Sequence, residues 1–209
     1  ERNEIVLHYQ PQVDVRDGSL VGLEALVRWQ PPREPLRFPG DFIPAAEESG
    51  LIVELGAWVM ETACQQMAHW RAQGCAPRRL ALNVSVQQLR QPDFARFVRR
   101  TLERAQLPPD VLELEITESV FADEDSRESM RRLAEVGVRL SLDDFGTGYS
   151  SLGYLREHPV EAIKIDRSFI DGVARSPTAA TLASTMIAMA HTLGKQVVAE
   201  GVETAEQLE

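Results

Sequence analysis

Hydrophobic positions along the chain follow two patterns, one typical of strands and the other of helices. Apolar runs rich in leucine and β-branched residues predict strands at residues 5–15, 20–29, 79–86, 111–117, 138–143, 161–166 and 195–200. Apolar positions spaced by three and four residues predict helices at residues 51–74 and 176–194, and a third that begins after Asp93 and ends before Pro108. Strands and helices therefore alternate along the chain.

This alternation predicts parallel strands joined by right-handed crossovers, in either an open doubly wound sheet or a closed barrel. Asp17-Gly18 between the first two runs is a hairpin signal, so these two strands should be antiparallel. No GxGxxG segment follows a predicted strand, and polar residues recur near the carboxyl ends of nearly all strands, which favours the barrel. We expect an α/β fold, a modified TIM-type (β/α)8 barrel with an antiparallel first strand.

The predicted strands are one fewer than such a barrel needs. Seven precede Glu209, whereas a (β/α)8 barrel has eight. We therefore expect residues 1–209 to form a single domain that is cut short before its last strand.

Composition and charge narrow the range of functions. The 209 residues are 44% hydrophobic, which is enough for one core. They contain no apolar run of the roughly 20 residues that a membrane span needs, so we expect no membrane contact by this segment. The net charge of −10 argues against binding of polymeric nucleic acid, because the phosphates would be repelled. A small phosphate substrate would need cations between it and the protein.

Strand side chains alternate between the barrel interior and the helix-facing surface. In residues 111–117 the apolar side chains take the outer surface, so Glu113, Glu115 and Thr117 should point inward. The same rule places a further set of polar side chains inside: Asn83, Asp143, Lys164 and Glu200. Glu24, Leu26 and Arg28 share one strand face. A single inward carboxylate is usually a salt-bridge partner or a solvated strand end, but repetition on five strands favours a functional site.

Converging carboxylates repel each other, and divalent cations relieve that repulsion. The candidate ligands are all oxygens, and none of the four histidines has zinc-like spacing, so the sequence favours Mg²⁺ or Mn²⁺. The adjacent pair Asp143-Asp144 is suited to bridging two ions, an arrangement typical of in-line attack at phosphorus.

Two segments carry a resemblance to a known family. Residues 24–29, Glu-Ala-Leu-Val-Arg-Trp, and residues 143–152, Asp-Asp-Phe-Gly-Thr-Gly-Tyr-Ser-Ser-Leu, resemble the EAL domain family, which contains phosphodiesterases of the bacterial second messenger cyclic di-GMP. The resemblance extends from Tyr9 to Glu203. It implies a modified TIM-type barrel whose first strand is antiparallel, in agreement with the hairpin signal.

The resemblance also implies roles for individual residues. One metal ion would be held by Glu24, Asn83, Glu115 and Asp143, and a second by Asp143, Asp144 and Glu200. The implied catalytic residues are Glu24, Lys164 and Glu200, with Lys164 assisting the attacking water. Substrate binding is expected of Gln10, Leu26, Arg28, Asp166 and Glu203. Glu118 is expected to position the loop 145–152, although it could instead cap the following helix. Two Mg²⁺ or Mn²⁺ ions are implied, with Ca²⁺ inhibitory.

The function implied is hydrolysis of cyclic di-GMP to linear 5′-pGpG. The alternative is a receptor that binds cyclic di-GMP without catalysis, and a weaker one is a metal-dependent barrel acting on another phosphodiester. Every expected metal position carries the matching residue, which favours the enzyme. We expect a cytoplasmic bacterial domain, whether free or part of a membrane-anchored protein. Homodimerisation and amino-terminal regulatory domains are left open.

Overall fold

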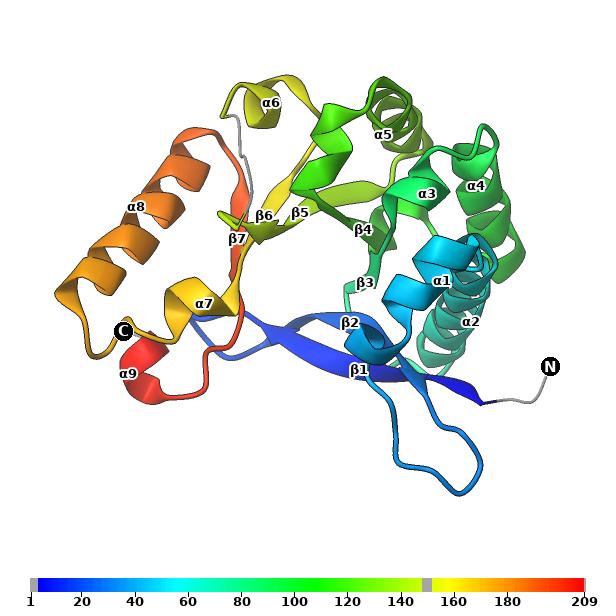
Figure 1. Ribbon diagram of the computed structural model, residues 1–209, viewed down its shortest axis with the longest axis horizontal. Coiled ribbons are helices and arrows are strands. Elements are labelled where there is room, and N and C mark those ends of the chain that lie inside the picture. Colours follow the sequence, from blue (N-terminus) through cyan, green and yellow to red (C-terminus); the bar gives the residue numbers. More distant parts are fainter. Residues whose placement is uncertain (1–3, 148–151, 209) are drawn as a thin grey trace.

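The computed structural model describes residues 4–147 and 152–208, which form one curled sheet covered by helices (Figure 1). The strands lie side by side in chain order: β1 (Ile5–Val13), β2 (Leu20–Trp29), β3 (Arg79–Asn83), β4 (Leu112–Thr117), β5 (Arg139–Phe145), β6 (Ala162–Ile165) and β7 (Gln196–Ala199). β1 and β2 pair antiparallel, and all later neighbours pair parallel. The expected modified barrel with an antiparallel first strand is therefore confirmed.

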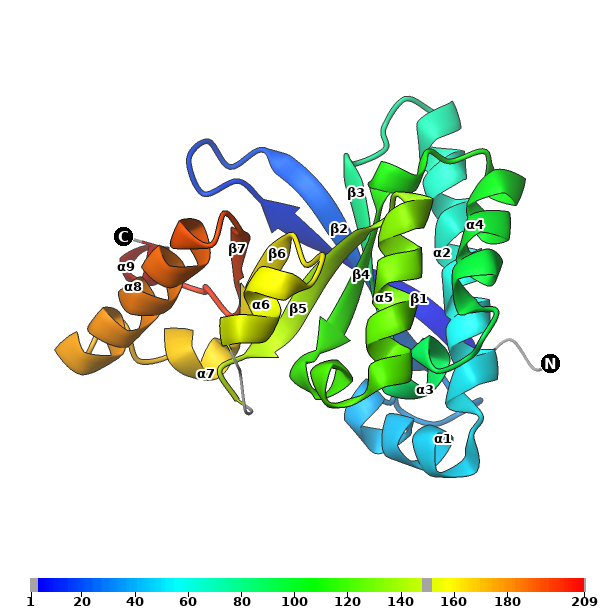
Figure 2. The ribbon, with the colours of Figure 1, turned by 90° about the horizontal axis from the view of Figure 1, so that it is seen from above.

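The helices lie in the connections between successive strands, on the outer side of the sheet, except α9, which follows β7. They are α1 (Ile43–Ser49), α2 (Ile52–Ala72), α3 (Val86–Leu89), α4 (Phe94–Ala105), α5 (Glu124–Val136), α6 (Leu152–Glu157), α7 (Arg167–Ile170), α8 (Pro177–Thr192) and α9 (Ala205–Leu208). Short 3-10 turns are η1 (Pro39–Asp41), η2 (Pro109–Val111) and η3 (Glu118–Ala122). Figure 2 shows α2, α4 and α5 grouped at the right of the view and α8 at the left, beside β7. No helix in the described ranges has the length and apolar character needed to cross a bilayer.

Local hydrogen bonds explain where the elements begin and end. The predicted strand 79–86 stops at Asn83, because the Ser85 hydroxyl accepts a hydrogen bond from the Gln88 backbone amide and so caps α3. Ser176 caps α8 in the same way, with Pro177 in the first turn, as its sequence predicts. The sequence pattern did not indicate α5, which is mostly charged and is capped by Asp123.

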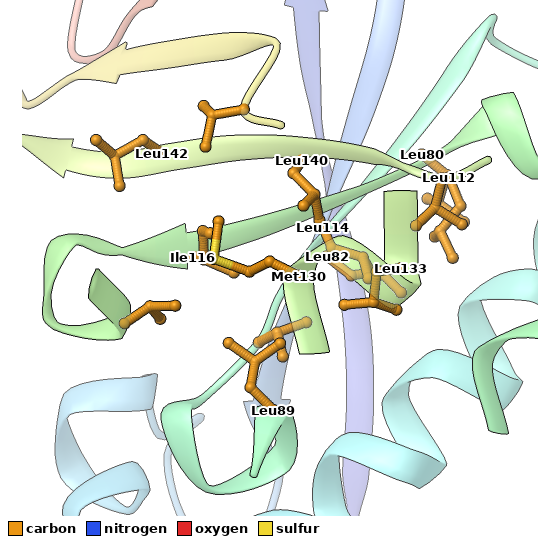
Figure 3. Close-up of a cluster of buried hydrophobic side chains, with 14 of the residues drawn as sticks. Leu80, Leu82, Leu89, Leu112, Leu114, Ile116, Met130, Leu133, Leu140 and Leu142 are labelled. Atoms are coloured by element: carbon orange, nitrogen blue, oxygen red, sulfur yellow. The ribbon is translucent and has the colours of Figure 1, made fainter. Parts of the chain in front are cut away.

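The core lies between the outer face of the sheet and the helices. Figure 3 shows the side chains that β3, β4 and β5 contribute: Leu80, Leu82, Leu112, Leu114, Ile116, Leu140 and Leu142. Met130 and Leu133 of α5 pack against them and are fully buried. Each such side chain contributes about 1.5–3 kcal/mol of burial free energy. Because apolar residues occupy the outer face, the alternate residues of the same strands face the barrel interior, as predicted.

Candidate active site

A buried lysine lies at the centre of the carboxylates predicted to face inward. Lys164 of β6 is 1% exposed. Its Nζ forms ion pairs with four carboxylates from other parts of the sheet: Glu115 at 2.6 Å, Glu200 at 2.8 Å, Asp143 at 3.1 Å and Glu24 at 3.3 Å. All lie toward the carboxyl ends of the parallel strands, where barrel enzymes gather their active sites. The structure thus brings together five of the residues singled out from the sequence.

Charge in this cluster is unbalanced, because four carboxylates share one ammonium group. Burial raises the pKa of Glu115 well above its usual value, and the Lys164 ammonium opposes this shift without cancelling it. Burial also raises the pKa of Glu200. For Lys164, burial by itself lowers the pKa, but the surrounding carboxylates outweigh burial and hold that pKa above its usual value. The carboxylates therefore favour the charged form of Lys164, and they favour additional positive charge beside it.

A bulge in β5 brings a further carboxylate to this edge. The register with β6 shifts between Leu142 and Phe145, so Asp143 and Asp144 both lie opposite Lys164. Asp144 has a φ of 52°, in the left-handed region, and its backbone amide donates to Asp143 Oδ1 at 3.0 Å. Burial raises the pKa of Asp144, and the neighbouring charge of Asp143 adds to the shift. One carboxylate oxygen each from Asp143, Asp144 and Glu200 lies within 4.8 Å of the others.

The donor set fits divalent cations. It consists of carboxylate oxygens and the side-chain amide of Asn83, whose Nδ2 donates to Glu24 Oε1 at 2.9 Å. Oε1 of Glu115 is buried and accepts no hydrogen bond within the described residues. An oxygen-rich group with excess negative charge and an unsatisfied buried acceptor matches the preference of hard cations. The group Asp143, Asp144 and Glu200 is thus a candidate metal site.

Glu118 contacts the segment that follows the two aspartates. Its Oε1 accepts a hydrogen bond from the Gly146 backbone amide at 3.0 Å, across 28 positions of sequence. Glu118 opens η3 without capping α5, which Asp123 caps. Gly146 has a φ of 98°, and a Cβ there would lie 2.9 Å from Phe169 and Met186. Of the loop 145–152 assigned from the sequence, residues 148–151 lie outside the described residues.

The residues assigned to substrate binding lie around this cluster without joining its ion pairs. Gln10 is exposed and pairs in register with Glu24. Leu26 is half-buried on the same strand. The remaining three have partners of their own. Asp166 accepts from the Ser168 amide at the start of α7, and Glu203 pairs with Arg167 at 3.1 Å.

Arg28 is held by a neighbour that the sequence did not indicate. Its guanidinium lies over the Phe38 ring, 5.0 Å from the ring centroid, and its Nη1 donates to the Val27 carbonyl at 2.8 Å. Phe38 is exposed and precedes η1. No periodic pattern links an isolated aromatic residue in a connection to a strand ten positions earlier. The Arg167 partner of Glu203 was missed for the same reason.

Comparison with known proteins identifies the family. Residues 1–209 match the EAL domain, and the chain belongs to this family. The Bacillus subtilis signaling protein YkoW is 44% identical over 209 residues, which cover 99% of this chain and 26% of that protein. The bifunctional diguanylate cyclase/cyclic di-GMP phosphodiesterase MucR of Pseudomonas aeruginosa is 45% identical over 211 residues, which cover 100% of this chain and 31% of that protein.

A solved structure agrees with these sequence matches. The PaMucR phosphodiesterase in complex with c-di-GMP has a TM-score of 0.93 and 44% identity, and the match covers 99% of this chain and 85% of that one. The chain spans about a quarter to a third of the length of the full relatives YkoW and MucR. Their additional segments therefore have no counterpart within the 209 residues.

Proposed function

We propose that this domain hydrolyses cyclic di-GMP to linear 5′-pGpG with the help of two Mg²⁺ or Mn²⁺ ions. The observation that carries the proposal is the convergence of Glu24, Glu115, Asp143 and Glu200 around Lys164, a cluster whose negative charge exceeds its positive charge. The EAL relative MucR is named as a phosphodiesterase of this messenger, and its structure was solved as a c-di-GMP complex.

The ligand assignment has two overlapping groups, and the structure supports one of them by the closeness of its oxygens. Asp143, Asp144 and Glu200 would hold one ion, because their oxygens already lie within 4.8 Å of one another. The second would be held by Glu24, Asn83, Glu115 and Asp143. When bound, the two ions would acidify water and offset the charge that develops on the phosphate. The acidic protein could then accept an anionic diester.

Lys164 is proposed as the residue that orients the attacking water. Four carboxylates hold its Nζ in place and raise its pKa, which favours donation of hydrogen bonds to the water over removal of its proton. A fixed cation beside the water would favour its deprotonated form, hydroxide. Glu24 and Glu200 contact the same Nζ and would complete the catalytic group.

The surrounding residues would bind and position the substrate. Arg28, stacked on Phe38, would contact a phosphate of the diester. Gln10, Leu26, Asp166 and Glu203 would contact the nucleotide or its ordered water. Glu118 would position Gly146 and with it the aspartates at the root of that loop.

The wider setting belongs to the same proposal. We place the domain in the bacterial cytoplasm and propose that regulatory segments precede it in the intact protein. The relatives are several times longer than this chain, which leaves room for such segments. A homodimer is part of this proposal. Neither polymeric nucleic acid nor a membrane surface is expected to bind the carboxylate cluster at the carboxyl ends of the strands.

The test is direct. Purified domain, cyclic di-GMP and Mg²⁺ or Mn²⁺ should yield 5′-pGpG, identified by chromatography and mass. Glu24→Ala should remove turnover and leave the domain folded, whereas Glu103→Ala, on the exposed face of α4, should behave as wild type. Binding of cyclic di-GMP without hydrolysis by the wild-type domain would instead support the receptor. Hydrolysis of other phosphodiesters alone would support the unrelated barrel enzyme.

A further inference from the structure

A second charged region lies at the opposite end of the strands. A cavity of about 650 Å³ lies where the amino ends of β3, β4 and β5 meet the end of α2. Four arginines and one carboxylate line it, together with small and apolar residues: Arg71, Arg78, Arg79, Arg139, Asp110, Gly74, Ala76, Pro77, Pro108 and Val111. Its volume falls in the range of about 300–1,000 Å³ typical of small-molecule sites.

Two of the arginines are fixed in place by internal contacts. Arg79 Nη1 and Arg139 Nη2 both donate to Gln196 Oε1, at 2.9 and 3.3 Å. Both also pair with the buried Glu113 carboxylate, at 3.7 and 3.6 Å. Their guanidinium groups therefore already converge on a single acceptor oxygen. Nε of Arg139 is buried, and among the described residues it has no hydrogen-bond acceptor.

The other two arginines are exposed at the rim. Neither Arg71 nor Arg78 forms an ion pair with any described residue. The lining thus has four guanidinium groups against one carboxylate, and it keeps a positive excess when the bonded partners Glu113 and Glu161 are added. This is the reverse of the chain as a whole, which carries −10. The lining would therefore attract an anion, whereas the carboxylate cluster at the carboxyl ends would repel it.

We propose that this cavity is a binding site for a small ligand that carries a terminal phosphate. Guanidinium forks match phosphate oxygens in spacing and charge, and several forks can share one dianionic group with three acceptor oxygens. Arg79 and Arg139 already engage Gln196, Glu113 and Glu161, so they would supply fixed positive charge at the inner end. Arg71 and Arg78 would supply the free donors and close on the phosphate from the rim. Pro77, Pro108 and Val111 offer an apolar wall to the organic part of the ligand.

The site is separate from the carboxylate cluster. Arg79 precedes Asn83, and Arg139 precedes Asp143, by four strand residues, which corresponds to about 13 Å. Without divalent cations the carboxylate cluster repels phosphates, whereas the arginine-lined cavity needs no metal. Binding in the presence of a chelator therefore distinguishes the two ends of the barrel.

The test is isothermal titration of the metal-free domain in EDTA with ribose 5-phosphate, pyrophosphate and, as the neutral control, ribose. The double variant Arg71→Ala/Arg78→Ala should weaken binding of both phosphates by at least about tenfold, because it removes the charge-assisted hydrogen bonds that the rim supplies. Both residues are exposed, so its melting temperature should stay that of the wild type. The matched control Arg99→Ala/Arg100→Ala removes two exposed arginines from α4 and should bind normally.

Four outcomes of this titration would overturn the proposal. These are no saturable binding of either phosphate by the wild type, equal binding of ribose and ribose 5-phosphate, an unaffected Arg71→Ala/Arg78→Ala variant, and an equal loss in the control variant. A further arm replaces EDTA with Ca²⁺, which is expected to bind with little turnover, and adds saturating cyclic di-GMP to occupy the carboxyl ends of the strands. Ribose 5-phosphate should still bind, and complete displacement would assign its binding to the carboxyl ends of the strands instead.

Discussion

Four strands contribute to both ends of the barrel, yet the two ends differ in how far their charges compensate one another. β3, β4, β5 and β7 each place one residue at the amino end and one at or just beyond the carboxyl end: Arg79 and Asn83, Glu113 and Glu115, Arg139 and Asp143, Gln196 and Glu200. At the carboxyl end four carboxylates share one ammonium group. At the amino end two guanidinium groups share Glu113 and Gln196.

The two ends differ in how far the protein's own side chains neutralise the charges there. Glu113 and its two arginines compensate one another, so the amino end stabilises the sheet as it stands. At the carboxyl end the negative charge exceeds the positive charge, and burial of that excess lowers the stability of the metal-free fold. Substitutions at the carboxyl end should therefore alter activity and metal binding, and substitutions inside the amino-end network should alter stability. The predictions below test this division.

Removal of divalent ions should have the largest effect. EDTA should reduce hydrolysis of cyclic di-GMP to background, and Mg²⁺ or Mn²⁺ should restore it. Ca²⁺ should bind yet support little turnover, because it tolerates longer and looser coordination than in-line attack permits. Added Mg²⁺ should also raise the melting temperature, since it binds the folded state selectively. Undiminished turnover in excess EDTA would contradict the two-metal proposal.

Lys164→Ala should have the next largest effect. The variant should lose about 10²–10⁴-fold in kcat, the usual contribution of a positioned group that assists proton transfer. Without metal it should also melt at a lower temperature, because four carboxylates lose their shared cation. Single-turnover hydrolysis at saturating metal measures the loss in catalysis, and calorimetric metal titration shows whether metal binding has changed as well. Near-normal turnover at saturating metal would leave Lys164 as a counter-charge only.

Two glutamates on one strand offer a matched comparison of the ends. Glu115→Gln should lower turnover by at least about 10²-fold, as loss of a group that stabilises transition-state charge does. It should not lower the metal-free melting temperature, because it relieves carboxylate crowding. Glu113→Gln should lower the free energy of unfolding by about 1–3 kcal/mol, since Arg79 and Arg139 lose their shared charge. Its turnover per folded molecule should match the wild type, and the reverse pattern would refute the division.

The sequence predicted this division only in part. Period-two alternation was enough to place Glu115, Asp143 and Lys164 on one face, because β4, β5 and β6 are regular up to that point. The same alternation would turn Asp144 outward. Asp144 reaches the carboxyl-end cluster through the bulge and a left-handed φ, which no apolar pattern encodes. The sequence indicated it instead through the adjacent acidic pair Asp143-Asp144 and through the family resemblance.

Contacts between distant segments were the least predictable. Gln196 accepts hydrogen bonds from Arg79 and Arg139, which lie 117 and 57 residues earlier in the chain. Sequence spacing does not predict contacts over such separations. The helix α5 was missed because most of its residues are charged, and its buried apolar side chains, Met130 and Leu133, are too few to stand out. Both omissions have one cause, since tertiary packing rather than local pattern decides these positions.

Glu118→Ala should have the smallest effect on activity. The change removes the acceptor for the Gly146 amide, two residues beyond Asp144, so the aspartates at the carboxyl end should be held less firmly. We expect a loss of about 10–100-fold in turnover or metal affinity, the usual range for residues that orient metal ligands, with the melting temperature nearly unchanged. Glu118→Gln keeps a carbonyl oxygen for the same hydrogen bond and should retain most of the activity. Wild-type kinetics in Glu118→Ala would show that the contact with Gly146 has no part in catalysis. Equal losses in both variants would assign the effect to the charge of Glu118 rather than to positioning.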